Sequence, residues 1–363
     1  MSTPREDDLV LVTGASGFLG MHCIVQLLAK GYRVRGTLRD LGRASWLMEV
    51  IGKHAEVRGR LSLVKAELGS DAGWPEAVAG CSYALHVASP VPVSAPKHPD
   101  DVIVPARDGT LRVLRAAAKA GVRRVVLTSS TAAVFYGHAR DGKKTYDEND
   151  WSNLTAEVGP YEQSKTLAER AAWDYVKSLP AEERMELVAL QPGAILGPVL
   201  DKDFSLSGEI VRKFMTREFP GCPDLGFALA DVRDVAGAHV QAMTLPAAAG
   251  QRFILALEHV PMTEIARILA AHFGPRGFKI PTRRVPSWVI KLAGMFDKTT
   301  ALAVPELGKR QDVSSARARA VLGWQPRSVE RMVVDMGESM IECGVFPVPG
   351  ARPGGMPQAT SQS

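Results

Sequence analysis

The chain has 363 residues, of which 46% are hydrophobic and 23% are charged, as in an ordinary globular enzyme. This length exceeds what a single hydrophobic core usually supports, so we expect a main domain with a smaller companion. The 44 basic and 39 acidic residues are interspersed and leave a formal net charge of +5. Such a pattern argues against nucleic acid or a membrane surface as a partner.

The cysteines show neither the spacing of a metal site nor that of a disulfide framework, and they are Cys23, Cys81, Cys222 and Cys343. We therefore expect no bound metal and reduced thiols, in keeping with a cytoplasmic protein. Residues 1–8 contain acids and no apolar core, unlike a secretory signal. The sequence also lacks a run of about 18 apolar residues, which a membrane-spanning helix needs.

A glycine-rich stretch follows the first predicted strand, the apolar run Leu9–Val12. It reads TGASGFLG over residues 13–20, and an amphipathic run comes next. Strand, glycine loop and helix form the context of a dinucleotide-binding fingerprint, here with GxxGxxG rather than GxGxxG spacing. Gly14 would permit the tight turn, Gly17 would admit the pyrophosphate, and Gly20 would allow close packing of helix and strand. The loop residues expected to contact the coenzyme are Gly14, Ser16, Gly17, Phe18 and Leu19.

A second predicted strand, residues 32–38, leads directly to Arg39. NAD-binding proteins commonly place an acid at this strand end, where it accepts a hydrogen bond from the ribose 2′-hydroxyl. A guanidinium suits a 2′-phosphate instead, because it offers paired, charged hydrogen bonds. Arg43, one turn further on, is a second cation in reach. The sequence therefore predicts NADP(H) as the cofactor.

Helices and strands continue to alternate, with helices predicted at 44–54, 74–78 and 101–120 and strands at 61–65, 83–87, 122–128 and 186–190. This alternation predicts an α/β fold with a Rossmann-type, doubly wound parallel sheet. Ligands bind such sheets at the carboxyl ends of the strands. His86, at one such end, is expected to be a packed or hydrogen-bonded histidine. The candidates for coenzyme contacts at these ends are Glu67, Leu68, Val87, Ala88, Ser89 and Thr128.

Tyr161 and Lys165 lie four residues apart in a predicted helix, residues 161–176. Positions i and i+4 of a helix share a face, so the phenol and the ammonium can lie side by side. A free phenol has a pKa of about 10, and a neighbouring cation lowers that value by favouring the phenolate. We therefore expect Tyr161 to act as a general acid or base.

Four motifs, TGASGFLG, HVASP, VVLTSS and YEQSKTLAE, occur in this order along the chain. Together they resemble the extended short-chain dehydrogenase/reductases over about residues 8–345. Within these enzymes, the chain is most similar to the branch of dihydroflavonol reductases, cinnamoyl-CoA reductases and microbial aldehyde/ketone reductases. One departure is Glu67, where relatives commonly have Asp.

The resemblance implies a catalytic trio of Ser130, Tyr161 and Lys165. Tyr161 would give its proton to the carbonyl oxygen as the nicotinamide delivers hydride to carbon, while Ser130 steadies that oxygen. Lys165 would lower the phenol pKa and hold the nicotinamide ribose. The resemblance also implies that Tyr161 and Lys165 contact the coenzyme, and that the nicotinamide is lined by the turn that contains Pro192, Gly193 and Ile195.

The remaining sequence predicts a smaller substrate-binding lobe. We assign residues 8–195 to a dinucleotide-binding domain, to which 231–256 return with a strand at 253–255, and residues 196–230 and 257–345 to the lobe. Helices in the lobe are expected at 261–273, 287–296, 315–322 and 329–343. The termini, residues 1–7 and 347–363, are expected to be disordered.

Phe135 aligns with an Asn by which plant dihydroflavonol reductases bond the hydroxylated ring of their substrate. A phenyl ring cannot make that bond, so we expect apolar or aromatic aldehydes and ketones as substrates. Ordinary core packing is an equal alternative for the apolar residues beyond 199. The candidates for substrate contact are Pro90, Thr131, Phe135, Met215 and Phe219.

The sequence therefore predicts an NADPH-dependent reductase of a small-molecule carbonyl substrate, either a monomer or a homodimer. An NAD-dependent nucleotide-sugar epimerase or dehydratase is one alternative, since it shares the fold and the Tyr/Lys pair. Such enzymes usually retain NAD, so Arg39 counts against this alternative. A non-catalytic NADP(H)-binding sensor of the same fold is the other, although such sensors tend to lose the pair.

Overall fold

The computed structural model of this protein describes residues 8–90, 96, 98–138, 145–296, 303–310 and 312–349. The predicted disorder of residues 1–7, and that of residues 350–363, lies outside these ranges. At the described C-terminal end, Phe346 is buried and Val348 packs against the main core. Residues 347–349, which fall within the predicted disordered tail, are thus part of the described chain.

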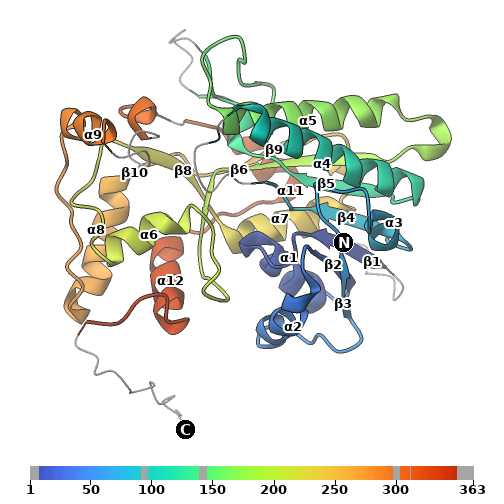
Figure 1. Cartoon of the computed structure of the whole chain (residues 1–363), viewed down its shortest axis with the longest axis horizontal. Coiled ribbons are helices and arrows are strands. Elements are labelled where there is room, and N and C mark those ends of the chain that lie inside the picture. Colours follow the sequence, from blue (N-terminus) through green and yellow to red (C-terminus); the bar gives the residue numbers. More distant parts are fainter. Residues whose placement is uncertain are drawn as a thin grey trace.

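A parallel sheet forms the centre of the fold (Figure 1), and its described strands follow the order β3-β2-β1-β4-β5-β6-β9. The strands are β1 (Leu9–Thr13), β2 (Arg33–Leu38), β3 (Leu61–Lys65), β4 (Tyr83–His86), β5 (Arg124–Thr128), β6 (Glu186–Pro192) and β9 (Arg252–Leu255). The predicted Rossmann-type sheet is confirmed. The returning strand, β9, lies parallel to β6 at the edge of the sheet.

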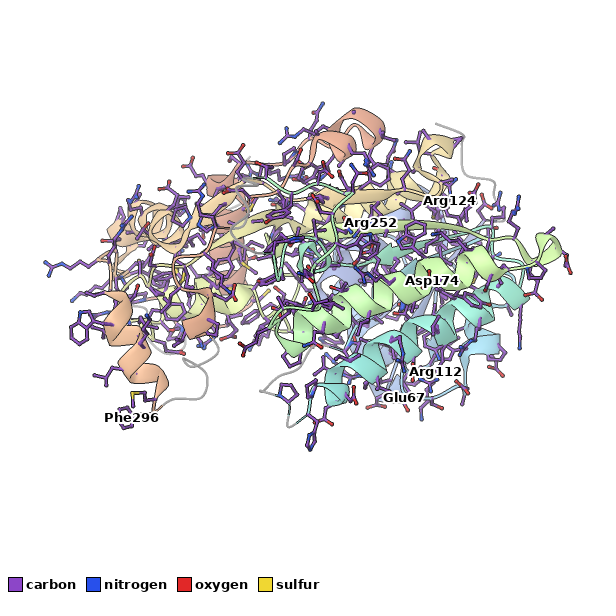
Figure 2. The ribbon with its side chains drawn as sticks, turned by 90° about the horizontal axis from the view of Figure 1, so that it is seen from above. Glu67, Arg112, Arg124, Asp174, Arg252 and Phe296 are labelled. Carbon is purple, nitrogen blue, oxygen red and sulfur yellow. The ribbon has the colours of Figure 1, made fainter. Side chains whose placement is uncertain are left out.

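Helices cover both faces of this sheet, because successive side chains of each strand point to opposite sides. Leu9 and Leu11 pack into one core, whereas Val10 and Val12 pack into the other. The first core is closed by α3 (Trp74–Val78), α4 (Asp100–Lys119) and α5 (Pro160–Ser178). The second is closed by α1 (Phe18–Ala29), α2 (Ala44–Gly52) and α7 (Val232–Thr244). Figure 2 shows α4, which carries Arg112, beside α5, which carries Asp174.

A second, smaller sheet has the strand order β10-β8-β7. Its strands are β7 (Ala194–Leu196), β8 (Gly226–Asp231) and β10 (His259–Pro261). The helices in the part of the chain predicted as a lobe are α6 (Gly208–Met215), α8 (Met262–Phe273), α9 (Ser287–Gly294) and α12 (Val329–Glu342), whereas α11 (Ala316–Leu322) lies against β9 and α7. The lobe helices that were predicted end within two residues of the predicted limits, whereas α6, β7, β8 and β10 were not predicted. The division into two domains stays a prediction.

None of the helices in the described part of the chain combines the length and the apolar character needed to cross a bilayer.

Candidate active site

In the glycine loop between β1 and α1, the positions of Gly14 and Gly20 are packed too tightly for a side chain. Gly14 has a φ of +67°, and a Cβ placed on it would lie 3.1 Å from the Cα of Ala88. A Cβ on Gly20 would lie 2.2 Å from the carbonyl oxygen of Gly14. The loop therefore needs glycine at both positions, so that α1 can begin directly beside the ends of β1 and β4.

The start of α1 offers free backbone donors to a phosphate group. Gly17 is the N-cap of α1, and neither a capping side chain nor an acid occupies the first turn. The first N–H groups of a helix lack partners within the helix, and its dipole favours an anion there. The Gly14 N–H donates to the Thr37 hydroxyl at 3.1 Å, which fixes the loop against β2. Of the other loop residues, Ser16 is half-buried, and Phe18 and Leu19 are buried. This geometry fits the pyrophosphate of a dinucleotide.

Arg39 directly follows β2 and is exposed at the carboxyl end of the strand. Among the described residues, no carboxylate forms an ion pair with it. Arg43 is engaged instead, since its guanidinium lies 3.0 Å from the Asp203 carboxylate and 4.2 Å from the centroid of Trp46. Of the two predicted phosphate ligands, Arg39 is therefore the one whose charge is available.

The segments after β3 and β4 border the loop. Glu67 is exposed, and Leu68 lies so close to α4 that a Cβ on Gly109 would come within 2.7 Å of it. The Ala88 N–H donates to the Thr13 hydroxyl at 3.0 Å, and Nδ1 of His86 lies 2.9 Å from the same oxygen. Burial lowers the pKa of His86 to about 3. His86 is therefore a neutral, packed histidine.

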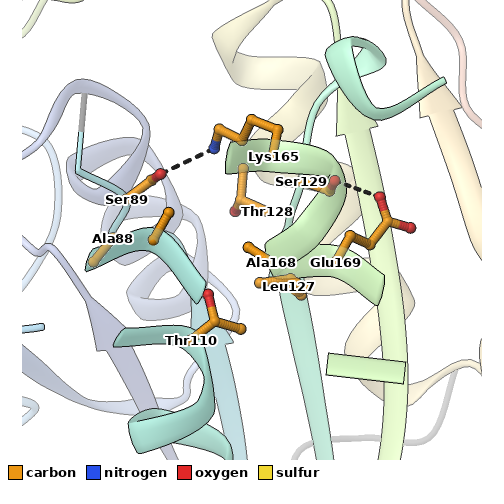
Figure 3. Close-up of a pocket in the computed structure, with 10 residues that line it drawn as sticks. Ala88, Ser89, Thr110, Leu127, Thr128, Ser129, Lys165, Ala168 and Glu169 are labelled. Atoms are coloured by element: carbon orange, nitrogen blue, oxygen red, sulfur yellow. Dashed lines mark hydrogen bonds between the residues drawn. The ribbon is translucent and has the colours of Figure 1, made fainter. Parts of the chain in front are cut away.

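The three predicted catalytic residues meet at the carboxyl edge of the sheet. Ser130 caps the 3₁₀ turn Thr131–Ala133 that follows β5, and its side chain is hydrogen-bonded to Tyr161. Tyr161 lies in the first turn of α5, and Nζ of Lys165 is 5.9 Å from the centre of its ring. Lys165 itself is buried and donates to the Ser89 hydroxyl at 3.1 Å (Figure 3).

The electrostatics of Tyr161 differ from the expectation. Burial raises the pKa of Tyr161, and the hydrogen bond with Ser130 offsets only part of that rise. Lys165 does not lower it here, because its ammonium is directed at Ser89 rather than at the phenol oxygen. Burial lowers the pKa of Lys165 to about 8, while the Glu169 carboxylate acts to raise it.

The end of β5 and the turn after β6 complete this edge. The Thr128 hydroxyl lies 2.7 Å from Nε2 of His239, so it is already engaged. At Gly193, a Cβ would lie 2.1 Å from the carbonyl oxygen of Ala228. Glycine therefore lets the chain pass close to β8 between Pro192, which ends β6, and Ile195 in β7.

The predicted substrate residues fall into two groups. Thr131 and Phe135 follow Ser130 on the same segment, and Phe135 stacks on Tyr136 with ring centroids 4.4 Å apart. Pro90, half-buried, closes the segment after β4. Met215 is buried in the main core, and Phe219 packs on Phe214 with centroids 5.0 Å apart. Substrate contact by any of these five residues stays a prediction.

Sequence reasoning missed the buried acid Glu169. Its carboxylate accepts a hydrogen bond of 2.5 Å from the Ser129 hydroxyl (Figure 3). The spacing gives a signal, because Glu169 follows Lys165 by the same four residues that separate Lys165 from Tyr161.

A doubly wound sheet with a glycine loop after β1 and a Ser–Tyr–Lys cluster at its carboxyl edge defines a dinucleotide-dependent enzyme of the short-chain dehydrogenase/reductase class. The model of the NAD dependent epimerase/dehydratase family matches residues 10–256, and the chain belongs to that family. The resemblance stated from the sequence motifs is confirmed.

Several reductases are similar to this chain. Cinnamoyl-CoA reductase 1 of Arabidopsis thaliana is 37% identical over 279 residues, which cover 76% of this chain and 77% of the relative. Tetraketide alpha-pyrone reductase 1 of the same plant is 32% identical over 345 residues, which cover 92% and 96%. Among solved structures, yeast methylglyoxal/isovaleraldehyde reductase Gre2 complexed with NADPH matches with a TM-score of 0.75 and 26% identity, over 93% of this chain and 100% of that one.

Proposed function

We propose that the protein uses NADPH to reduce the carbonyl group of apolar or aromatic aldehydes and ketones to an alcohol. The observation that carries the proposal is the meeting of Ser130, Tyr161 and Lys165 at the sheet edge, next to the glycine loop. The similar proteins described above are reductases. The chain is accordingly an NADP-dependent oxidoreductase, and the class of its carbonyl substrate is what we add.

The coenzyme site runs along the carboxyl ends of β1, β2 and β4. Its pyrophosphate is assigned to the N-terminus of α1, where Gly17 leaves backbone donors free. Its 2′-phosphate is assigned to Arg39, whose exposed guanidinium has no ion pair among the described residues. Its nicotinamide ribose is assigned to Lys165. The Lys165 ammonium is bonded to Ser89 and so lies between the glycine loop and Tyr161.

When bound, NADPH supplies the hydride for the carbonyl carbon, and the side chains of this chain handle the proton. Because burial raises the pKa of Tyr161, the phenol is protonated at neutral pH and is ready to act as the acid. Tyr161 gives this proton to the carbonyl oxygen, which Ser130 steadies by a hydrogen bond. The Lys165 ammonium, which is directed at Ser89, would hold the nicotinamide ribose, and solvent returns a proton to the Tyr161 phenolate.

The test is NADPH oxidation by the purified protein against a panel of aldehydes, ketones, dihydroflavonols and acyl-CoA thioesters. We expect turnover to be fastest with apolar or aromatic aldehydes and ketones, and to be lost on the same panel in Tyr161→Phe. If the purified protein instead carries tightly bound NAD and fails to oxidise NADPH with any carbonyl of the panel, it is an epimerase or dehydratase.

A further inference from the structure

A fully buried carboxylate lies directly behind the catalytic cluster. Glu169 is on α5, one turn after Lys165, and its side chain is 0% exposed. A buried charge is costly unless it is paired and hydrogen-bonded. Here the carboxylate accepts hydrogen bonds from Ser129 Oγ at 2.5 Å, Arg252 Nε at 2.7 Å, Gln191 Nε2 at 3.0 Å and Trp173 Nε1 at 3.2 Å.

Arg252, at the start of β9, anchors this carboxylate to a distant part of the chain. Its Nη1 donates to the carbonyl oxygens of Glu148 and Asp150, both at 2.8 Å. Its guanidinium also lies 3.6 Å from the ring centroid of Trp151. Figure 2 shows Arg252 over the middle of α5, the helix that carries Glu169. The two carbonyl oxygens and the Trp151 ring therefore fix the Arg252 guanidinium while it pairs with Glu169.

Glu169 reaches the Ser130 side of the catalytic cluster through Ser129. The Ser129 hydroxyl donates to Glu169, and the Ser129 N–H donates to the carbonyl oxygen of Leu190 in β6 at 2.7 Å. Ser129 is thus fixed by its side chain and by its backbone. Since Ser130 is the next residue, its position depends on this attachment.

Glu169 also acts on Lys165, the second part of the catalytic cluster, through its negative charge. Ser129, Lys165 and Glu169 line one small cavity between α4, α5 and the end of β5 (Figure 3). The titratable groups that face the ammonium are Glu169 and Tyr161 on α5 and His86 on β4, where burial keeps the imidazole neutral. Among the described residues, the negative charge that acts on Lys165 is the one on Glu169.

We propose that Glu169, anchored by Arg252, is a positioning residue that fixes Ser130 through Ser129 and supplies the buried negative charge one turn along α5 from the Lys165 ammonium. This inference rests on the proposed function, because it concerns the same serine and lysine. Glu169 itself touches neither the carbonyl substrate nor the coenzyme in this scheme.

The decisive variant is Glu169→Gln, which keeps the shape of the side chain and removes its charge. Removing the negative charge that acts on Lys165 favours its neutral amine. We therefore expect the alkaline limb of the pH profile of NADPH affinity to move toward lower pH. NADPH affinity is measured by fluorescence without turnover. The alkaline limb of kcat should move with it.

Glu186→Gln is the matched control. Glu186 pairs with the buried Arg124 at 2.6 Å, but at the opposite ends of β5 and β6, away from the site. We expect this variant to keep the wild-type pH profile. If both variants lower activity equally at every pH and leave the limb in place, the inference is overturned.

A second variant guards against misfolding, because Glu169→Gln alone leaves the buried guanidinium without its counter-charge. The double variant Glu169→Gln/Arg252→Gln removes both charges and should show the same downward movement of the limb. A folded double variant with the wild-type limb would equally contradict the inference. If the wild type binds NADPH but reduces no carbonyl, the proposed function fails, while the binding profile still decides the role of Glu169.

Discussion

The ammonium nitrogen of Lys165 lies 3.1 Å from the hydroxyl oxygen of Ser89, which fastens α5 to the segment after β4. Ala88, the residue before Ser89, packs against Gly14 of the glycine loop. One short path of contacts thus links the loop assigned to the pyrophosphate with the helix that carries Tyr161. The loop assigned to the coenzyme and the proton donor are therefore joined by direct contacts.

Tyr161→Phe removes the proton donor and keeps the ring. General acid catalysis is typically worth about 10²–10⁴-fold, so turnover should fall by that order. NADPH affinity should stay near that of the wild type, because the ring and Lys165 remain. Steady-state kinetics with a titration of NADPH fluorescence measure both quantities. Ser130→Ala, which keeps the acid, should lose less, and near-full turnover by Tyr161→Phe would refute the mechanism.

The pH dependence should follow Lys165. Burial lowers its pKa to about 8, so the ammonium is present below that pH and is lost above it. Since reduction also needs protonated Tyr161, whose pKa is raised, the lysine loses its proton first. We therefore expect reduction to decline above a pH of about 8. A profile of kcat/KM that stays flat to pH 10 would exclude a role for the Lys165 charge.

Local patterns predicted the elements that carry much of the candidate site. The glycine spacing gave the β1–α1 loop, and the i, i+4 relation placed Tyr161 and Lys165 on one helix. Contacts between distant residues could not be predicted this way. Arg252 pairs with Glu169 across 83 positions, and Lys165 bonds Ser89 across 76. No spacing rule encodes such pairs.

Two of the missed elements, β7 and β10, have 3 residues each, too few for a periodic pattern to be recognised. The other two, α6 and β8, have 8 and 6 residues and lie in a stretch of sequence without a clear periodic pattern. Tertiary packing forms them, through the buried residues Val211 and Phe214 of α6 and through hydrogen bonds to β8. The pKa of Tyr161 also escaped sequence reasoning, since it depends on burial and on where the Lys165 side chain points.

Gly20→Ala should damage the coenzyme site without touching a catalytic group. Its Cβ would lie 2.2 Å from the Gly14 carbonyl oxygen, so α1 and the loop would have to separate. Overpacking of this kind costs about 1–3 kcal/mol. We expect a lower Tm and weaker NADPH binding. Gly69→Ala is the control, because a Cβ there meets no atom within 4 Å, and equal effects of the two changes would contradict the explanation.

Phe135 tests the proposed substrate class. Phe135→Asn supplies a polar group on the segment that follows Ser130, so the ratio of kcat/KM for dihydroflavonols to that for apolar aldehydes should rise. A hydrogen bond of this kind contributes about 0.5–1.5 kcal/mol, so the ratio should rise by a few-fold to about tenfold.

Phe135 also packs beside the cluster of Val134, Ile254 and Val313, so the thermal unfolding of the variants and the wild type must be compared. Phe135→Leu keeps an apolar side chain, and its ratio should match that of the wild type. An unchanged ratio in folded Phe135→Asn would place the substrate elsewhere.

Arg39 should set the choice of coenzyme. NADPH differs from NADH by its 2′-phosphate, and Arg39 is the exposed cation at the end of β2, since Arg43 is paired with Asp203. A hydrogen bond to a charged group contributes about 1.5–3 kcal/mol, and about 1.4 kcal/mol is tenfold in affinity. Arg39→Ala should therefore raise KM for NADPH by about ten- to a hundredfold and leave NADH kinetics nearly unchanged. Arg39→Asp should go further, because its carboxylate repels the phosphate and accepts a hydrogen bond from the 2′-hydroxyl of NADH.

Arg33→Ala, which removes an exposed arginine from the opposite end of β2, controls for the loss of net charge. Paired kinetics of the wild type and the three variants with each coenzyme decide the matter. Equal use of NADH and NADPH by the wild type would mean that Arg39 does not hold the phosphate.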